Sequence, residues 1–303
     1  MRLSVGNLLP RLCLGAVFLL FAEITQAVET GYLEKAVCGL KEPFYFWLWQ
    51  RAAGRADSRR IGGVEGVEEV SFRTIDGRTL RGYRLKAKRG VARDGQARGF
   101  LLVAPGNAML ADQVLAGFVP FARAGIDVYL YDYRGYGRSG GRSRLQAIVN
   151  DYRQISSQLG AGHYLEHLYY GMSFGGIVLL NALAGIDPRA RLVVDSSPAR
   201  LSNHGCPEAY DPVRHLPADA GSILFVVGGR DTVVPPRDSA ELVEAGVARG
   251  AHVLRDPELN HPFMDGDPVA HERRMDAVRS FLLGGRESGT ANQPSLSLPG
   301  IAQ

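Results

Sequence analysis

Residues 168–176, which read LYYGMSFGG, decide the fold, because a short apolar run meets a serine with glycines close on both sides. The run Leu168–Gly171 predicts a buried strand, and Phe174–Ala184 has the apolar period of a helix. A serine at such a tight strand-to-helix junction needs small neighbours two positions before and after it. The junction exposes the hydroxyl of Ser173 at the positive end of a helix, where developing negative charge is stabilised. We therefore predict a nucleophile here rather than a plain glycine-rich turn.

Similar apolar runs without alternation recur along the chain, and continuous apolar strands are typical of a parallel sheet buried on both faces. They are Gly99–Ala104, Val128–Tyr131, Leu192–Val194 and Ile223–Val227, with a shorter strand at Val253–Arg255. Stretches with helical period separate them: Gln113–Ala124, Leu145–Leu159, Pro236–Ala248 and Val269–Leu283. This alternation predicts an α/β fold with a mostly parallel central sheet and helices on both faces.

The stretch before these runs has a different period. Val67–Ile75 alternates between apolar and polar residues, Asp76-Gly77 is a tight-turn pair, and Leu80–Leu85 alternates again. This pattern predicts a β-hairpin that adds an N-terminal antiparallel edge to the sheet. We expect one α/β domain over residues 64–283, followed by a disordered tail over residues 284–303, which are rich in Gly, Ser and Pro.

The composition is that of an ordinary globular protein: 303 residues, 46% hydrophobic and 22% charged. The 35 basic and 31 acidic residues are interspersed, so the net charge of +4 does not predict a nucleic-acid partner. The arginine-rich stretch Arg51–Arg60 is interpreted as a solvated linker.

The N-terminus has the organisation of a targeting segment. Arg2 and Arg11 precede the apolar run Leu12–Ala22, and small residues mark a cleavage site after Ala27. The run is shorter than the ~20 residues that a membrane-spanning helix needs. We predict a signal peptide over residues 1–27 and an exported protein, secreted or periplasmic; the alternative is an uncleaved membrane anchor.

Cleavage there would leave two cysteines, Cys38 and Cys206. An oxidising compartment allows them to pair, but their positions in the sequence do not show that they lie within reach of each other. The expectation is two unpaired cysteines, with a disulfide as the alternative.

Residues 28–63 are expected to form an N-terminal aromatic helix and a polar linker. The stretch 41–50, KEPFYFWLWQ, holds both tryptophans of the chain, and Pro43 suits the start of a helix. Two interpretations stay open. The favoured one packs the aromatic side chains on the domain, and the other makes a peripheral membrane contact through Phe44–Trp49.

A serine hydroxyl is a weak nucleophile and needs a general base. His261 lies in the loop Pro257–Phe263, between the short strand Val253–Arg255 and the final helix. An open α/β sheet places its site in loops at the carboxyl ends of strands, so His261 is the predicted base. The other histidines precede strands or lie elsewhere: His163, His167, His204, His215, His252 and His271.

The base needs a carboxylate that fixes its tautomer. Asp231 follows the apolar strand Ile223–Val227 and gives the chain order Ser, Asp, His that this architecture expects. Asp231 is the predicted acid, with Asp195 as a rival at the end of another strand and Asp256 as a remote one. The other interpretation of Asp195 is that it caps the turn that follows it.

Acyl transfer also needs donors for the oxyanion. We expect the backbone N–H of Phe174 and that of Asn107, with Ala108 as its neighbour, in the stretch Ala104–Ala108 after the first parallel strand. The alternative is that Pro-Gly-Asn forms only a turn.

No metal or cofactor is expected. His163–His167 fits the pattern H-x-x-E-H, but the inverted zinc motif needs a real helix, and only these residues separate Gly162 from a strand. The chain has no P-loop pattern, and no dinucleotide fingerprint follows its first parallel strand.

Residues 67–283 resemble the α/β-hydrolase superfamily, with Ser173, Asp231 and His261 at its triad positions. Three stretches resemble its serine aminopeptidase-like or Bem46-like branch: Pro105–Ala108, Tyr131–Ser139 and Tyr210–Val213. The first usually reads His-Gly-Asn-Ala in that branch, and here Pro105 replaces the histidine.

The resemblance implies a serine hydrolase that cleaves small-molecule carboxylic esters or thioesters through an acyl-enzyme. The alternatives are an acyltransferase, a lipid or amide hydrolase on the same triad, or a non-catalytic binding protein with this fold. Residues 196–222 form the cap segment between two strands. Because four prolines disfavour a long helix in it, we expect only a short cap loop and an open site.

Overall fold

The computed structural model describes residues 33–88, 96–184 and 190–285. The predicted signal peptide, and the predicted tail from residue 286 on, lie outside the described residues. No helix within the described ranges has both the length and the apolar character needed to cross a bilayer.

An eight-stranded sheet forms the centre of the molecule, with strand order β1-β2-β4-β3-β5-β6-β7-β8. The β1–β2 and β2–β4 pairs are antiparallel, and all other pairs are parallel. The predicted α/β fold with an N-terminal antiparallel hairpin is therefore confirmed. The strands are β1 (Val67–Arg73), β2 (Thr79–Leu85), β3 (Gly99–Ala104), β4 (Ile126–Tyr131), β5 (Glu166–Met172), β6 (Ala190–Asp195), β7 (Ile223–Gly228) and β8 (His252–Asp256).

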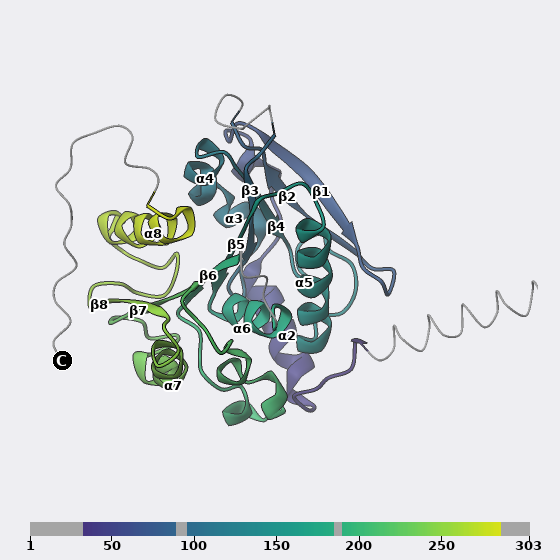
Figure 1. The fold of residues 1–303 in the computed structure, drawn as a ribbon. Coiled ribbons are helices and arrows are strands. Elements are labelled where there is room, and N and C mark those ends of the chain that lie inside the picture. Colours follow the sequence, from purple (N-terminus) through teal and green to yellow (C-terminus); the bar gives the residue numbers. More distant parts are fainter. Residues whose placement is uncertain (1–32, 89–95, 185–189, 286–303) are drawn as a thin grey trace, which may run out of the picture.

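Helices cover both faces of the sheet (Figure 1). They are α2 (Lys41–Ala53), α3 (Ala111–Val114), α4 (Val119–Arg123), α5 (Leu145–Gly160), α6 (Phe174–Ala182), α7 (Pro236–Val247) and α8 (Pro268–Leu283). Helices α5, α6 and α7 pack on one face together with α2, and α3, α4 and α8 pack on the other.

The continuous apolar strands pack against helices on both faces of the sheet. Every residue of β3 is buried. Phe100 and Leu102 belong to the core under α5 and α6, whereas Leu101 and Val103 belong to the core under α4 and α8. A strand with apolar contacts on both faces has no polar side to alternate with, which explains the pattern in the sequence.

One predicted helix is wrong. Gln113–Ala124 is not continuous but consists of α3, the 3-10 turn η2 (Leu115–Phe118) and α4. Pro120 lies in the first turn of α4. Because proline has no backbone N–H to donate to the preceding turn, the helix restarts there instead of running through.

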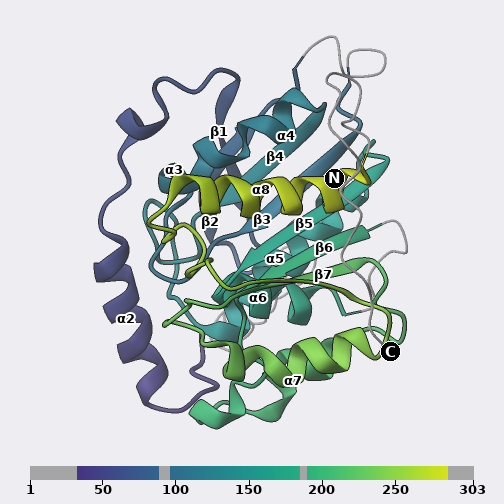
Figure 2. The same ribbon diagram turned by 90° about the vertical axis from the view of Figure 1, so that its left-hand side faces the viewer.

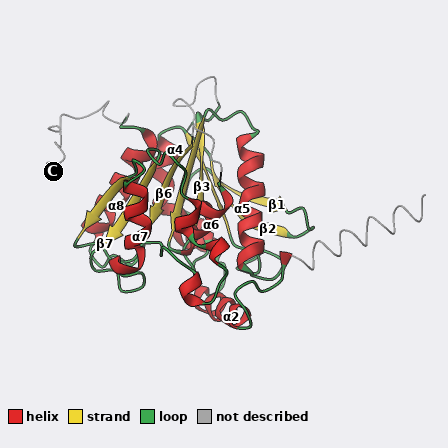
Figure 3. Ribbon diagram, turned by 60° about the horizontal axis from the view of Figure 1, so that its bottom comes forward, coloured by secondary structure: helices red, strands yellow, loops and turns green. Residues whose placement is uncertain are grey.

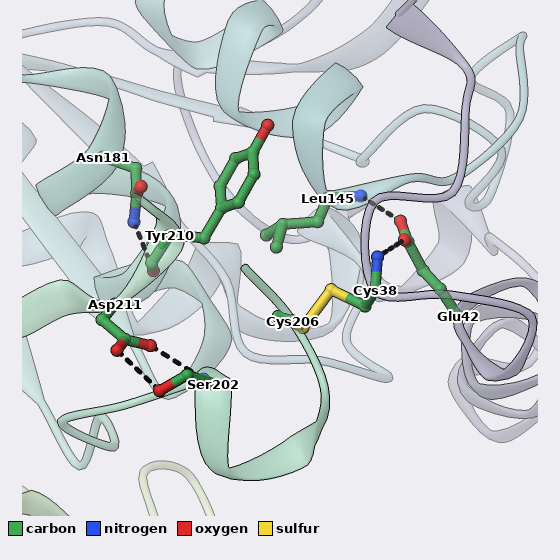
Figure 4. Close-up of a disulfide and its surroundings, with 8 residues drawn as sticks. All are labelled: Cys38, Glu42, Leu145, Asn181, Ser202, Cys206, Tyr210 and Asp211. Atoms are coloured by element: carbon green, nitrogen blue, oxygen red, sulfur yellow. Dashed lines mark hydrogen bonds between the residues drawn. A yellow bond between two sulfur atoms is a disulfide. The ribbon is translucent and has the colours of Figure 1, made fainter. Parts of the chain in front are cut away.

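The N-terminal segment is attached to the domain through a disulfide between Cys38 and Cys206 (Figure 4). The expectation of two unpaired cysteines is therefore wrong. Their Cα atoms lie 4.0 Å apart although 168 positions separate them in sequence. Such proximity depends on how α2 and the cap segment pack, which no local pattern in the sequence encodes.

The cap segment, residues 196–222, contains only three 3-10 turns: η3 (Ser202–His204), η4 (Glu208–Tyr210) and η5 (Pro212–His215). Asp211 holds the segment together, because it accepts hydrogen bonds from the backbone N–H and the hydroxyl of Ser202 (Figure 4). The prolines before η4 and at the start of η5 fit short turns rather than a long helix.

Candidate active site

Ser173 occupies the junction between β5 and α6 with a backbone φ of 52° and ψ of −116°. This conformation is unfavourable for a residue with a side chain, and such strain is concentrated at functional sites. The two flanking glycines make the turn sterically feasible. A Cβ on Gly171 would lie 2.7 Å from the Cα of Gly176, and one on Gly175 would lie 1.9 Å from the carbonyl oxygen of Ala104.

Asp231 and His261 form a hydrogen-bonded pair. Nδ1 of His261 lies 2.8 Å from Oδ2 of Asp231, and both side chains are buried. The other carboxylate oxygen, Oδ1, accepts the backbone N–H groups of Val233 and Val234 at 2.9 and 2.8 Å. These contacts fix the carboxylate after β7 and orient the imidazole in the loop after β8.

The pKa of Asp231 is lowered. Burial on its own raises it, but the hydrogen bonds from His261, Val234 and Ser196, together with the charge of the His261 imidazolium, outweigh the cost of burial. Asp231 is thus an ionised carboxylate at neutral pH, as the partner of a general base must be.

The rival carboxylate, Asp195, has a different environment. It is fully buried at the end of β6, where it binds Arg274 at 2.6 Å and accepts the phenol of Tyr170 at 2.8 Å. The hydroxyl of Ser196 also lies 3.2 Å from it. Asp195 therefore balances a buried guanidinium, and the carboxylate that accepts the hydrogen bond from His261 is that of Asp231.

The loop after β3 lies beside Ser173. A Cβ on Gly106 would lie 3.7 Å from the Cβ of Ser173. The backbone N–H of Ala108 donates to Oδ1 of Asn107 at 3.2 Å, whereas that of Asn107 has no protein acceptor among the described residues. The N–H of Phe174, the first residue of α6, has no partner within its helix. Among the described residues, neither of the two expected oxyanion donors is thus engaged by a protein acceptor.

Two tyrosines that support this loop did not emerge from the sequence as functional residues. The phenol of Tyr136 donates to Oδ1 of Asn107 at 2.7 Å, and that of Tyr133 donates to the carbonyl of Pro105 at 2.6 Å. Both are buried. Both tyrosines lie in Tyr131–Ser139, the stretch that resembles the serine aminopeptidase-like branch. That resemblance marked the stretch, but it did not show that the two phenols support the loop after β3.

The H-x-x-E-H stretch has structural contacts. His167 is buried in β5 and contacts the carbonyl oxygen of Tyr164, Glu166 pairs with Arg98, and the His163 ring packs on Tyr164. Within the described ranges, no three His, Cys, Asp or Glu side chains are grouped so that they could hold a metal ion.

Comparison with known proteins agrees with the observed fold. Residues 95–218 match the family model of the serine aminopeptidases. An esterase of Pyrococcus furiosus has the same fold, with a TM-score of 0.58 and 18% identity over 76% of this chain and 94% of that one. The chain has the α/β-hydrolase fold, and the family match agrees with the resemblance of its sequence to that superfamily. Its sheet order and the positions of the candidate triad after β5, β7 and β8 are those expected of an α/β-hydrolase.

Two proteins similar to this chain are named for an activity. A monoacylglycerol lipase of Mycolicibacterium smegmatis is 27% identical over 212 residues, covering 68% of this chain and 69% of the lipase. A polyketide transferase of Penicillium crustosum is 28% identical over 163 residues, covering 50% of this chain and 51% of the transferase. These relatives support a hydrolase that acts on small molecules.

Proposed function

We propose that this α/β-hydrolase is a serine hydrolase that cleaves carboxylic esters or thioesters through an acyl-enzyme. The Asp231–His261 hydrogen bond carries the proposal, because it connects the loops after β7 and β8 on the same sheet edge as the strained serine. A binding protein of this fold would not need an ionised carboxylate hydrogen-bonded to a buried imidazole on the same sheet edge as a strained serine.

Each residue has a role in the proposed reaction. Ser173 Oγ attacks the acyl carbon while Nε2 of His261 takes its proton, and Asp231 stabilises the imidazolium through Nδ1. The backbone N–H groups of Phe174 and Asn107 bind the oxyanion. The imidazolium then returns its proton to the departing alcohol or thiol, and a water attacks the acyl-enzyme by the same route.

A fluorophosphonate label and a panel of p-nitrophenyl esters test this function. We expect the label on Ser173, and a loss of turnover by roughly 10⁴-fold or more in Ser173→Ala. Ser202→Ala, a serine in the cap segment, is the matched control and should keep most of the activity. Stoichiometric labelling elsewhere, or ester turnover that survives in Ser173→Ala, would exclude the proposal.

A second candidate is acyl transfer to an acceptor other than water. The similarity to a polyketide transferase favours it, because both reactions share the acyl-enzyme and differ only in the second nucleophile. Adding primary alcohols to the ester assay separates the two. A transferase releases ester products in excess over acid at low alcohol concentration, and a hydrolase releases acid.

We also propose that the protein is exported, with a mature N-terminus near Val28. The Cys38–Cys206 disulfide supports an oxidising compartment. Mass spectrometry of the native protein tests this, because retention of residues 1–27 would favour a membrane anchor instead.

A further inference from the structure

Helix α2 presents an apolar face to solvent. Five large side chains on or next to the helix are exposed: Leu40 (96%), Phe44 (58%), Tyr45 (43%), Trp47 (50%) and Leu48 (45%). We call these five residues the α2 face. Leu40, Phe44, Trp47 and Leu48 recur at the spacing of one side of a helix, and the Phe44 and Trp47 rings stack with centroids 5.9 Å apart. Contiguous exposed apolar residues of this size indicate an interaction site.

The exposed charges on α2 and directly after it, up to Arg55, are all positive. Lys41, Arg51 and Arg55 are exposed, and the Arg51 guanidinium lies over the Trp47 ring at 5.1 Å. The only acidic residue between Lys35 and Arg55 is Glu42. It is buried, and its carboxylate accepts the backbone N–H groups of Cys38 and Leu145 (Figure 4). A partner of the α2 face therefore has an apolar surface with negative charge at its edge.

A cavity of about 210 Å³ adjoins the face between α2 and the loop before α5. Two arginines line it, Arg142 and Arg144, together with Trp47 and Gln50. Nε of Arg144 is buried and has no hydrogen-bond partner. No acidic residue lines this cavity, so its guanidinium groups extend the cationic border to the other side of the helix.

The exposed face is not needed to hold α2 in place, because the opposite side does so. Phe46 is buried edge-on against Phe174 with centroids 5.7 Å apart, and Gln50 hydrogen-bonds to Ser143. The disulfide of Cys38 fixes the chain just before the helix. Helix α2 thus forms a firmly attached rim of the molecule (Figures 2 and 3).

We propose that the α2 face docks this protein on a membrane surface that contains anionic phospholipids. Tryptophan and tyrosine prefer the boundary between headgroups and acyl chains, and lysine and arginine around an apolar helix face bind anionic headgroups. Because Phe46 contacts the residue that follows Ser173, docking places the candidate active site next to the lipid headgroups. The docking does not depend on what Ser173 does chemically.

Charge argues against two other occupants of the face. Residues 1–22 of the chain are apolar but carry Arg2 and Arg11 and no acidic residue, so they do not complement a cationic border. A second copy packed face to face would bring Lys41, Arg51 and Arg55 of both chains together. An anionic bilayer provides both an apolar interior for the exposed side chains and negative headgroups for the basic residues around them.

The tryptophans provide a specific probe, because Trp47 and Trp49 are the only two in the chain and both belong to α2. The full chain is mixed with phosphatidylcholine vesicles, with or without phosphatidylglycerol. We expect the emission to shift to the blue, and to be quenched by lipids brominated near the headgroup, when phosphatidylglycerol is present. Phe44→Ser/Leu48→Ser should abolish the shift while both tryptophans remain.

A charge variant tests the cationic border separately. Lys41→Gln/Arg51→Gln/Arg55→Gln should weaken partitioning into anionic vesicles by about 100-fold, given ~1 kcal/mol per basic residue near the surface. The matched controls are Leu165→Ser/Val269→Ser, which removes exposed apolar side chains elsewhere, and Arg214→Gln/Arg230→Gln/Arg237→Gln. Both controls should bind as the wild type does.

Three results would overturn the proposal. One is tryptophan emission that stays unchanged on anionic vesicles, even if the protein sediments with them through another segment. Another is an equal response to pure phosphatidylcholine. The third is a dimer in solution that dissociates in Phe44→Ser/Leu48→Ser, which would assign the face to a second copy. Melting temperature checks that each variant is folded.

Discussion

The phenol of Tyr136 donates a 2.7 Å hydrogen bond to the side-chain oxygen of Asn107, the residue whose backbone N–H is the expected second oxyanion donor. Neither side chain needs to touch a substrate. The contact fixes the loop after β3 in one position relative to the nucleophile elbow. An oxyanion donor is effective only if it is already in place when charge develops, so this contact is a positioning interaction.

We therefore expect Tyr136→Phe to lower kcat while KM changes little. A lost hydrogen bond is worth ~1 kcal/mol, which corresponds to a five- to tenfold loss of rate. Ester hydrolysis at saturating substrate measures it. Tyr164→Phe, which removes a buried phenol away from the site, is the control. A rise in KM with unchanged kcat would assign Tyr136 to substrate binding instead.

The nucleophile and its base should act as one unit. Ser173→Ala and His261→Ala are each expected to lower kcat by several orders of magnitude, and the double variant should be little worse than either single one. Single-turnover rates of an activated ester measure all three. If the loss of kcat in the double variant equals the product of the two single losses, His261 does not act as the general base for Ser173.

Substitution of the two buried aspartates should have different effects, one on catalysis and the other on stability. Asp231→Asn leaves the fold largely intact but gives His261 the wrong tautomer, and we expect kcat to fall by roughly 10⁴-fold. Asp195→Asn leaves the buried guanidinium of Arg274 with one carboxylate partner, Asp265, besides the carbonyl oxygen of Asn260. Removing one partner of a buried pair costs ~3–5 kcal/mol, and because Asp265 remains, we expect about 3 kcal/mol of unfolding free energy.

Activity and urea unfolding of both variants separate these effects. If Asp195→Asn has the lower kcat per folded molecule, the acid is misassigned. The pH dependence adds a check. Because the pKa of Asp231 is lowered in the folded state, its pairing contributes stability above the ordinary carboxyl range, and this contribution is lost as the pH falls through the folded pKa. The stability difference between wild type and Asp231→Asn should therefore shrink in acid.

The sequence could point to Ser173, Asp231 and His261 because each is defined by a local pattern at the end of a strand, and the structure places Asp231 and His261 in contact. Ser173 follows an apolar run and precedes a helical one, and Asp231 and His261 follow the next strands in the expected order. The Cys38–Cys206 bond and the Phe46–Phe174 contact could not be predicted in this way. Both join α2 to parts of the chain more than a hundred residues away, and neither leaves a periodic signal.

Removing the disulfide tests how far it supports the cap segment. We expect Cys38→Ser/Cys206→Ser to lose about 2–4 kcal/mol of unfolding free energy, since the bond closes a long loop of the unfolded chain. Hydrogen exchange should rise in residues 201–215 and in α2, while the strands stay protected. Reduced wild type is the control. Equal stability in the oxidised and reduced states would mean that packing alone holds the segment.

The last prediction concerns the acyl chain. The cap segment has only 3-10 turns, so it builds no multi-helix cover over the sheet edge, and a long acyl chain gains little from it. Each methylene that does become buried adds only ~0.8 kcal/mol. In a vesicle-free assay we expect butyryl and hexanoyl esters of p-nitrophenol to be turned over faster than palmitoyl esters.

Helix α2 is the element that could add an apolar wall, because Phe46 packs on Phe174 beside the serine. Deleting α2 would remove all of its contacts with the domain at once, so Phe46→Ala is the cleaner change, with Phe44→Ala on the exposed side as its matched control. If Phe46→Ala leaves the order of esters unchanged, α2 contributes only structure. A clear preference of the wild type for palmitoyl over butyryl esters would show that apolar area is buried at this site after all, and α2 would then be the first place to look for it.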